Sequence, residues 1–251
     1  TVDKLIKRFI VFITLFLCQY SYGNEVIKPV IRAAVAEEFR TGLHSKYLQY
    51  FADKLNVTLE LSTMPFARRI AQIKSGELDL IVGIQKTEAR QDEFIYIMPH
   101  YELLSYRLFT LKKDQNKIKS YQDLSGKYIG VNRYAKYFKV FDEDKTIDKF
   151  KASGVMQNIE LLLRNRIDAF IHYEQSTLPL LAKADIDNNI VQTPYQPNIE
   201  ARHYLAISSH SVLVKRQHEL QQIIAKAIKN KDLLTIRLNH YAEVHQKALN
   251  K

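Results

Sequence analysis

A helix, a tight turn and a buried strand follow one another over residues 65–82, and this succession constrains the fold more than any other segment. Phe66, Ile70 and Ile73 recur at helical spacing, and Ser75-Gly76 marks the end of the helix. The short apolar run that follows is typical of a strand covered on both faces of its sheet. The segment therefore predicts an α/β fold.

One arginine, Arg90, comes shortly after this strand, in the sequence Thr87-Glu88-Ala89-Arg90. Open α/β sheets bind their ligands beyond the carboxyl ends of their strands. The planar guanidinium fork matches a carboxylate. Position alone also allows an ordinary surface arginine near Glu88 and Glu93, so two interpretations stay open at this point.

A second copy of the same pattern occurs in the other half of the chain. Residues 165–171 repeat the turn, the Leu/Ile-Asp pair and the buried strand of residues 76–82. Alternating strands and helices predict parallel sheets with helices on both faces, and the repetition predicts two lobes of similar design. We expect strands at 30–35, 57–61, 78–82, 101–111, 128–131 and 204–208, and helices at 43–55, 66–75, within 150–164, at 177–183 and within 212–241.

The segment around Arg90 resembles the first lobe of the bacterial extracellular solute-binding proteins of family 3, in which an aromatic-led helix, a G-x-x-D strand and a T-x-x-R loop occur together. The sequence at 123–131 is similar to the family's D-L-x-G-K-x-x-G-V, which opens the second lobe. The resemblance implies a two-lobe, periplasmic-binding-protein-like α/β fold of type II, with two sheets joined by a double-crossover hinge. We expect lobe 1 at 24–103 plus 196–251 and lobe 2 at 104–195.

In the family this arginine holds the substrate's α-carboxylate, so the resemblance implies the same role for Arg90. The other first-lobe candidates are Thr87, Gly83, Gln85, Phe66 and Phe39. Thr87 offers a hydroxyl and Gln85 an amide, Gly83 lets a ligand approach the backbone, and the two phenylalanines offer aromatic faces. Two of these have a structural alternative, since Thr87 suits a helix cap and Phe66 suits core packing.

The second lobe departs from the family's amino-acid pattern. Asn132 and Arg133 follow its first strand where the family carries Gly and Ser/Thr, and Tyr173 stands where an ammonium-binding aspartate is expected. An α-ammonium group needs an anion once it is desolvated. Either a glutamate supplies that anion from another angle or the ligand lacks an α-amino group. The glutamates considered are Glu174, Glu38 and Glu37, and the second-lobe candidates for the ligand site are Asn132, Arg133, Tyr173 and Glu174.

The N-terminus predicts export. Basic residues precede the apolar run Phe9–Cys18, which is too short to span a bilayer, and small residues at Ser21 and Gly23 follow. We expect a signal peptide over residues 1–23 and a periplasmic protein, with a buried helix or a membrane anchor as the alternatives. Cys18 is the single cysteine, so the mature chain would hold no disulfide.

The resemblance implies reversible capture of a small, carboxylate-bearing, amino-acid-like solute for an ABC-type uptake system. We expect a monomer with no cofactor or metal, and a permease or sensor as a separate chain. The formal charge is +10, but the lysines are scattered, without the aromatic interleaving of nucleic-acid sites, so no nucleic-acid partner is expected. The main alternative is a ligand-sensing module for a membrane receptor.

An enzyme on the same fold, a lyase or dehydratase, is the weaker alternative. His172 and Glu174 offer a general acid–base pair. The sequence holds no nucleophile elbow, metal-ligand spacing or phosphate-binding glycine loop, so the chain is not expected to be an enzyme. His100, His203 and His240 are expected to be surface or packing residues.

Overall fold

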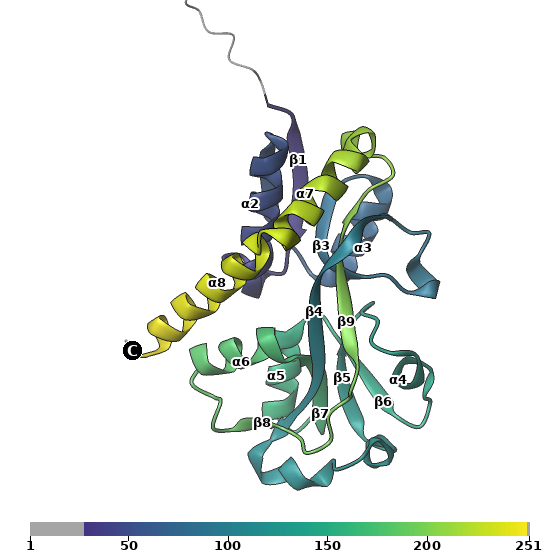
Figure 1. Ribbon diagram of the computed structural model, residues 1–251. Coiled ribbons are helices and arrows are strands. Elements are labelled where there is room, and N and C mark those ends of the chain that lie inside the picture. Colours follow the sequence, from purple (N-terminus) through teal and green to yellow (C-terminus); the bar gives the residue numbers. More distant parts are fainter. Residues whose placement is uncertain (1–27, 250–251) are drawn as a thin grey trace, which may run out of the picture.

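The computed structural model describes residues 28–249, which form two lobes connected by two neighbouring strands (Figure 1). The predicted signal peptide lies outside the described residues. The strands are β1 (Val30–Val35), β2 (Thr58–Thr63), β3 (Leu80–Gln85), β4 (Ile95–Leu111), β5 (Tyr128–Asn132), β6 (Asp148–Ala152), β7 (Ala169–Tyr173), β8 (Ile190–Gln192) and β9 (Glu200–Ile207). The α-helices are α2 (Leu43–Leu55), α3 (Phe66–Ser75), α4 (Lys139–Glu143), α5 (Val155–Leu163), α6 (Glu174–Lys183), α7 (Gln217–Lys229) and α8 (Asp232–Leu249).

Each lobe contains a three-stranded parallel unit, in the order β2-β1-β3 in the first and β6-β5-β7 in the second. The expected parallel sheets are in fact mixed, since β9 pairs antiparallel with β3, and β4 pairs antiparallel with both β9 and β7. The reason is that β4 carries the chain out of the first lobe and β9 brings it back, so these neighbours run in opposite directions. The two-lobe fold is confirmed, whereas the exact lobe boundaries stay predictions.

Helices cover both faces of the first-lobe sheet, and the alternation of side chains along β1 explains how. Ile31, Ala33 and Val35 point to the core that is shared with α2 and α7, while Ala34 points to the core beneath α3. In the second lobe, α4 contributes to one core and α5 to another. Each lobe is therefore a layered α/β unit with its own hydrophobic interior.

The repeated Leu/Ile-Asp turn has the same structural role in both lobes. A carboxylate oxygen of Asp79 accepts a hydrogen bond from the backbone N–H of Arg32, and one of Asp168 accepts from the backbone N–H of Tyr128, at 2.9 Å in each case. The N–H groups of the two aspartates donate in return to the carbonyls of Arg32 and Tyr128, at 2.8 Å. The carboxylate thus fixes the entry of β3 or β7 against the neighbouring parallel strand.

Candidate functional site

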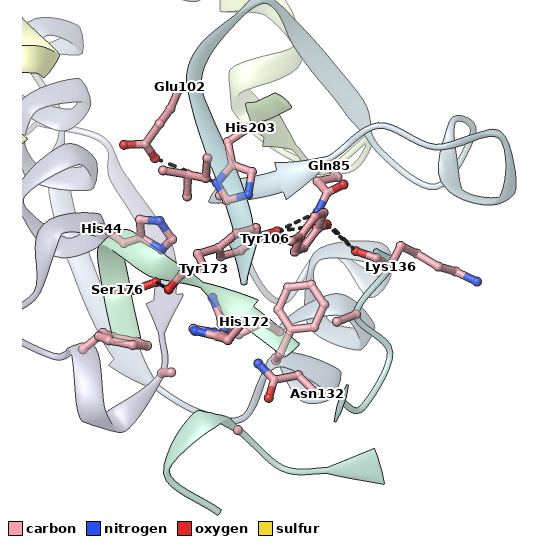
Figure 2. Close-up of a pocket in the computed structure, with 18 of the residues that line it drawn as sticks. His44, Gln85, Glu102, Tyr106, Asn132, Lys136, His172, Tyr173, Ser176 and His203 are labelled. Atoms are coloured by element: carbon pink, nitrogen blue, oxygen red, sulfur yellow. Dashed lines mark hydrogen bonds and ion pairs between the residues drawn. The ribbon is translucent and has the colours of Figure 1, made fainter. Parts of the chain in front are cut away.

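A cavity of about 140 Å³ lies between the two lobes, beside β4 and β9 (Figure 2). A volume of this order accepts a molecule about the size of benzene. The carboxyl ends of parallel strands from both lobes reach it, through Gly83 and Gln85 of β3, Asn132 of β5 and Tyr173 of β7. This is where open α/β sheets bind their ligands.

Most of the sequence-predicted site residues are brought together here. Thr87, Arg133 and Glu174 are not among the lining residues, although the Thr87 hydroxyl is buried and has no hydrogen-bond partner in the described part of the chain. Its side chain makes no capping bond to the short 3₁₀-helix Glu88–Arg90, so the capping alternative does not account for it. The predicted residues that line the cavity are Phe39, Phe66, Gly83, Gln85, Arg90, Asn132 and Tyr173.

The Arg90 side chain is buried in the wall of this cavity, with 5% of its surface exposed. Its Nε lies 3.2 Å from a Glu93 carboxylate oxygen, and its Nη2 donates a 2.5 Å hydrogen bond to the backbone carbonyl of Tyr134 in the second lobe. Its Cζ lies 5.8 Å from the centroid of the Phe66 ring. A guanidinium carries five N–H groups, so these contacts orient Arg90 and leave donors for a carboxylate.

Gln85 joins the two lobes at the end of β3. Its Nε2 lies 2.6 Å from the Tyr173 hydroxyl and 3.1 Å from the backbone carbonyl of Lys136, and it also contacts the Tyr106 hydroxyl (Figure 2). An amide nitrogen carries two hydrogens, so it serves two of these oxygens at a time. The Tyr106 hydroxyl donates to the Lys136 carbonyl as well, at 3.0 Å. These bonds connect the two lobes beside the cavity.

The cavity wall carries an excess of positive charge. Among the described residues that line it, the basic ones other than histidine are Arg69, Arg90 and Lys136, and the one carboxylate is Glu102. Figure 2 shows the Lys136 ammonium directed away from the cavity, so the two guanidinium groups carry the positive charge of the wall. Glu102 lies on β4 where the strand leaves the first lobe, and one of its oxygens forms an ion pair with Arg237 of α8. Burial raises the pKa of Glu102 above its ordinary value, against the opposing effect of Arg237.

Three histidines also line the cavity: His44 at the start of α2, His172 on β7 and His203 on β9. Burial lowers the pKa of His44 and of His172 to about 4, and that of His203 to about 3. From the sequence, His203 is expected to be a surface or packing residue, whereas in the structure it lines the cavity. Strand pairing sets Glu102 opposite His203, and no local sequence signal reveals that register.

The acid–base pair considered from the sequence is not assembled. A carboxylate oxygen of Glu174 lies 3.2 Å from Nη2 of Arg107 and the other accepts a 2.9 Å hydrogen bond from Gln192. His172 Nδ1 lies 2.8 Å from the Thr177 hydroxyl. Within residues 28–249, no hydrogen bond joins His172 to Glu174.

Over residues 28–249, no helix is both long enough and apolar enough to cross a membrane.

Comparisons with known proteins agree with this architecture. The family described as "Bacterial extracellular solute-binding proteins, family 3" matches residues 34–236. The "Probable amino-acid-binding protein YxeM" of Bacillus subtilis (strain 168) is 21% identical over 211 residues, which cover 82% of this chain and 79% of that protein. The chain spans only about half the length of PatH from Vibrio harveyi, with 25% identity over 143 residues, or 55% of this chain and 56% of that protein.

A solved structure shows the same fold. The amino acid ABC transporter substrate-binding protein AbpA from Streptococcus pneumoniae, crystallised with L-arginine, superimposes with a TM-score of 0.74. The match covers 86% of this chain and 95% of that one at 19% sequence identity. At this identity the likeness establishes the fold and leaves the ligand to be argued from the site.

Proposed function

The chain belongs to the bacterial extracellular solute-binding proteins of family 3, and on that premise we propose that it captures a small carboxylate-bearing, amino-acid-like solute in the periplasm. The captured solute would pass to an ABC-type permease formed by separate chains. The names of YxeM and AbpA, which refer to amino-acid binding and amino-acid ABC transport, support this reading.

The observation that carries the proposal is the charge of the cavity between the lobes. Two guanidinium groups, those of Arg69 and Arg90, line it against the single carboxylate of Glu102 among the described lining residues. Glu102 is itself paired with Arg237. An anionic group on the solute would balance this excess, and a buried guanidinium binds a carboxylate more strongly than an exposed one because water competes less.

The arrangement supports capture in two stages. Arg90, Gly83 and Phe66 belong to the first lobe and would bind the solute while the cleft is open. Closure about β4 and β9 would then bring Asn132 and Tyr173 of the second lobe over it. Gln85 would lock the closed form, because its amide bonds to Tyr173 and to the backbone of Lys136.

The site also bears on how an amino group would be recognised. Tyr173, at the position of the family's aspartate, bonds to Gln85 and offers no charge to a ligand ammonium. Glu102 is the carboxylate that the described lining residues provide instead. We therefore expect weaker discrimination in favour of an α-amino group than the family pattern implies, so that simple carboxylates and dicarboxylates belong in the ligand search.

The test is a thermal-shift screen of amino acids, dicarboxylates and small peptides, followed by calorimetric titration of the best hit. Arg90→Ala should weaken its affinity by about 10–100-fold, the loss expected for hydrogen bonds to a charged group. Arg90→Lys keeps the charge but loses the planar fork, so its affinity should lie between those of the wild type and of Arg90→Ala.

The matched control is Arg164→Ala at the C-terminal cap of α5, where the arginine side chain is 71% exposed and pairs with Glu160. It should leave the affinity unchanged. The melting temperature of each ligand-free variant reports whether it is folded. A folded Arg90→Ala protein that binds the best hit as tightly as the wild type would refute the assignment.

A further inference from the structure

We propose that His44, Glu102 and His203 form a binding site for a divalent transition-metal ion in the cleft wall. Each residue offers one ligand atom, and the three atoms all lie within 4.8 Å of one another. The proposal goes beyond solute capture and does not depend on it, because metal binding is measurable on the protein alone.

The two imidazoles and the carboxylate are ligands that suit zinc and the other late first-row transition metals. Imidazole nitrogens with one carboxylate oxygen are ligands that Zn²⁺, Ni²⁺ and Cu²⁺ accept, whereas Mg²⁺ and Ca²⁺ prefer sites built from oxygens. Bonds to zinc measure about 2.0–2.2 Å, so modest side-chain rotations would bring the three atoms onto one ion. The remaining coordination positions would face the cavity, which all three side chains line.

Unsatisfied buried atoms provide independent support. The side chain of His203 is 1% exposed, yet neither of its ring nitrogens has a hydrogen-bond partner in the described part of the chain. The Oε2 atom of Glu102 is buried and equally without a hydrogen bond, and it lies 3.9 Å from Nδ1 of His203, too far to form one. Buried polar atoms of native proteins are normally paired, so a cluster of unpaired donors and acceptors points to a ligand.

The surroundings also resemble the outer shell of a metal site. The other oxygen of Glu102 accepts a 3.2 Å hydrogen bond from the Tyr47 hydroxyl and pairs with Arg237. These contacts fix the carboxylate so that Oε2 is presented to His203, as outer-shell partners do for ligating carboxylates. Figure 2 shows Glu102 and His203 adjacent on the cavity wall, with His44 close by.

Three elements distant in the sequence create the cluster. Glu102 and His203 are cross-strand partners on β4 and β9, the strands that join the lobes. His44 lies in the first turn of α2, and its ring lies so close to Gly83 that an added Cβ there would overlap Cε1 of His44. A bound ion would therefore tie the α2 start to the hinge strands.

The experiment uses the full chain without an affinity tag, dialysed against EDTA and then against metal-free buffer. Titration with Zn²⁺ alone should show one saturable site per chain and a melting temperature raised by several degrees. Mg²⁺ and Ca²⁺ should produce neither effect. X-ray absorption of the zinc-loaded protein should show two imidazole ligands and an oxygen ligand.

His44→Gln and His203→Gln should each weaken zinc binding at least tenfold. His218→Gln, on the exposed surface of α7, is the matched control and should bind as the wild type does. His44→Gln carries the test if His203→Gln fails to fold, because His44 is only partly buried. No saturable zinc binding, or binding that both cavity variants retain, would overturn the proposal. The solute screen is run in EDTA, so the two proposals fail separately.

Discussion

At the scale of single residues, the backbone conformation and the nearby His44 ring both require glycine at position 83. Its backbone φ is +73°, a conformation that L-residues adopt only with strain, and its N–H donates a 2.9 Å hydrogen bond to the Tyr101 hydroxyl. The His44 ring also occupies the space that a Cβ would need. The glycine therefore permits both the strand-to-loop geometry and the approach of His44 to the cavity.

Gly83→Ala should lower the free energy of unfolding by about 1–3 kcal/mol, measured by urea denaturation. Gly126→Ala is the matched control, because Gly126 has a similar φ of +70° but no atom within 4 Å of the added Cβ. The loss of unfolding free energy in the control should reflect the backbone strain alone. Equal losses in the two variants would mean that the His44 contact contributes nothing.

At the scale of elements, local patterns predicted the strand 30–35 and the helix 43–55, which coincide with β1 and α2. The prediction missed β6 and β8. Three of the five residues of β6 are exposed and β8 is three residues long, so neither carries the apolar run or the clean alternation that marks a strand. β4 begins six residues earlier than expected, because it continues back into the first lobe beside β9.

The turn that is repeated in the two lobes gives an element-scale prediction. Asp79→Ala should cost about 2–3 kcal/mol of stability, because the Asp79 side chain is 7% exposed and its loss leaves the N–H of Arg32 without its partner. Asp168→Ala removes the same bond at an exposed position, where water replaces it, and should cost about 1 kcal/mol or less. Urea denaturation of both variants checks the difference, and an equal cost would contradict the burial argument.

At the scale of the whole molecule, Gln85 supplies side-chain bonds that connect the two lobes. Gln85→Ala removes the amide that contacts Tyr106, Tyr173 and the Lys136 carbonyl. We expect the ligand-free variant to be more open, with a larger radius of gyration in small-angle scattering, and to bind its solute more weakly. Gln222→Ala, exposed on α7, should behave as the wild type. An unchanged radius in Gln85→Ala would show that other contacts set the closure.

The buried histidines predict how stability depends on pH. The pKa of His172 is lowered by burial from 6.5 to about 4. Between these two pH values, His172 is therefore mostly protonated in the unfolded chain and mostly neutral in the folded chain. The contribution of neutral His172 to the free energy of unfolding is therefore present above pH 6.5 and is lost as the pH drops toward 4. The cavity histidines His44 and His203 are electrostatically coupled to His172, so protonation of one opposes protonation of the others.

For His172 alone, about 2 kcal/mol should be lost between pH 7.5 and pH 5. His172→Gln, measured in EDTA by urea denaturation at both pH values, should lose less than the wild type by about this amount. His218→Gln, at an exposed site, should keep the wild-type dependence. A His172→Gln protein with the full wild-type dependence would show that other groups are responsible.

Local signals in the sequence predict the two-lobe α/β fold, because helical spacing, apolar runs and the repeated Asp turn each act within a few residues. The sequence also placed Arg90 and Gln85 after a buried strand, at the end of the sheet where ligands bind. Three contacts appear only in the folded structure: Glu102 faces His203, Gln85 reaches Tyr173, and Glu174 pairs with Arg107. These contacts depend on strand register and lobe closure between distant segments, which no local spacing in the sequence records.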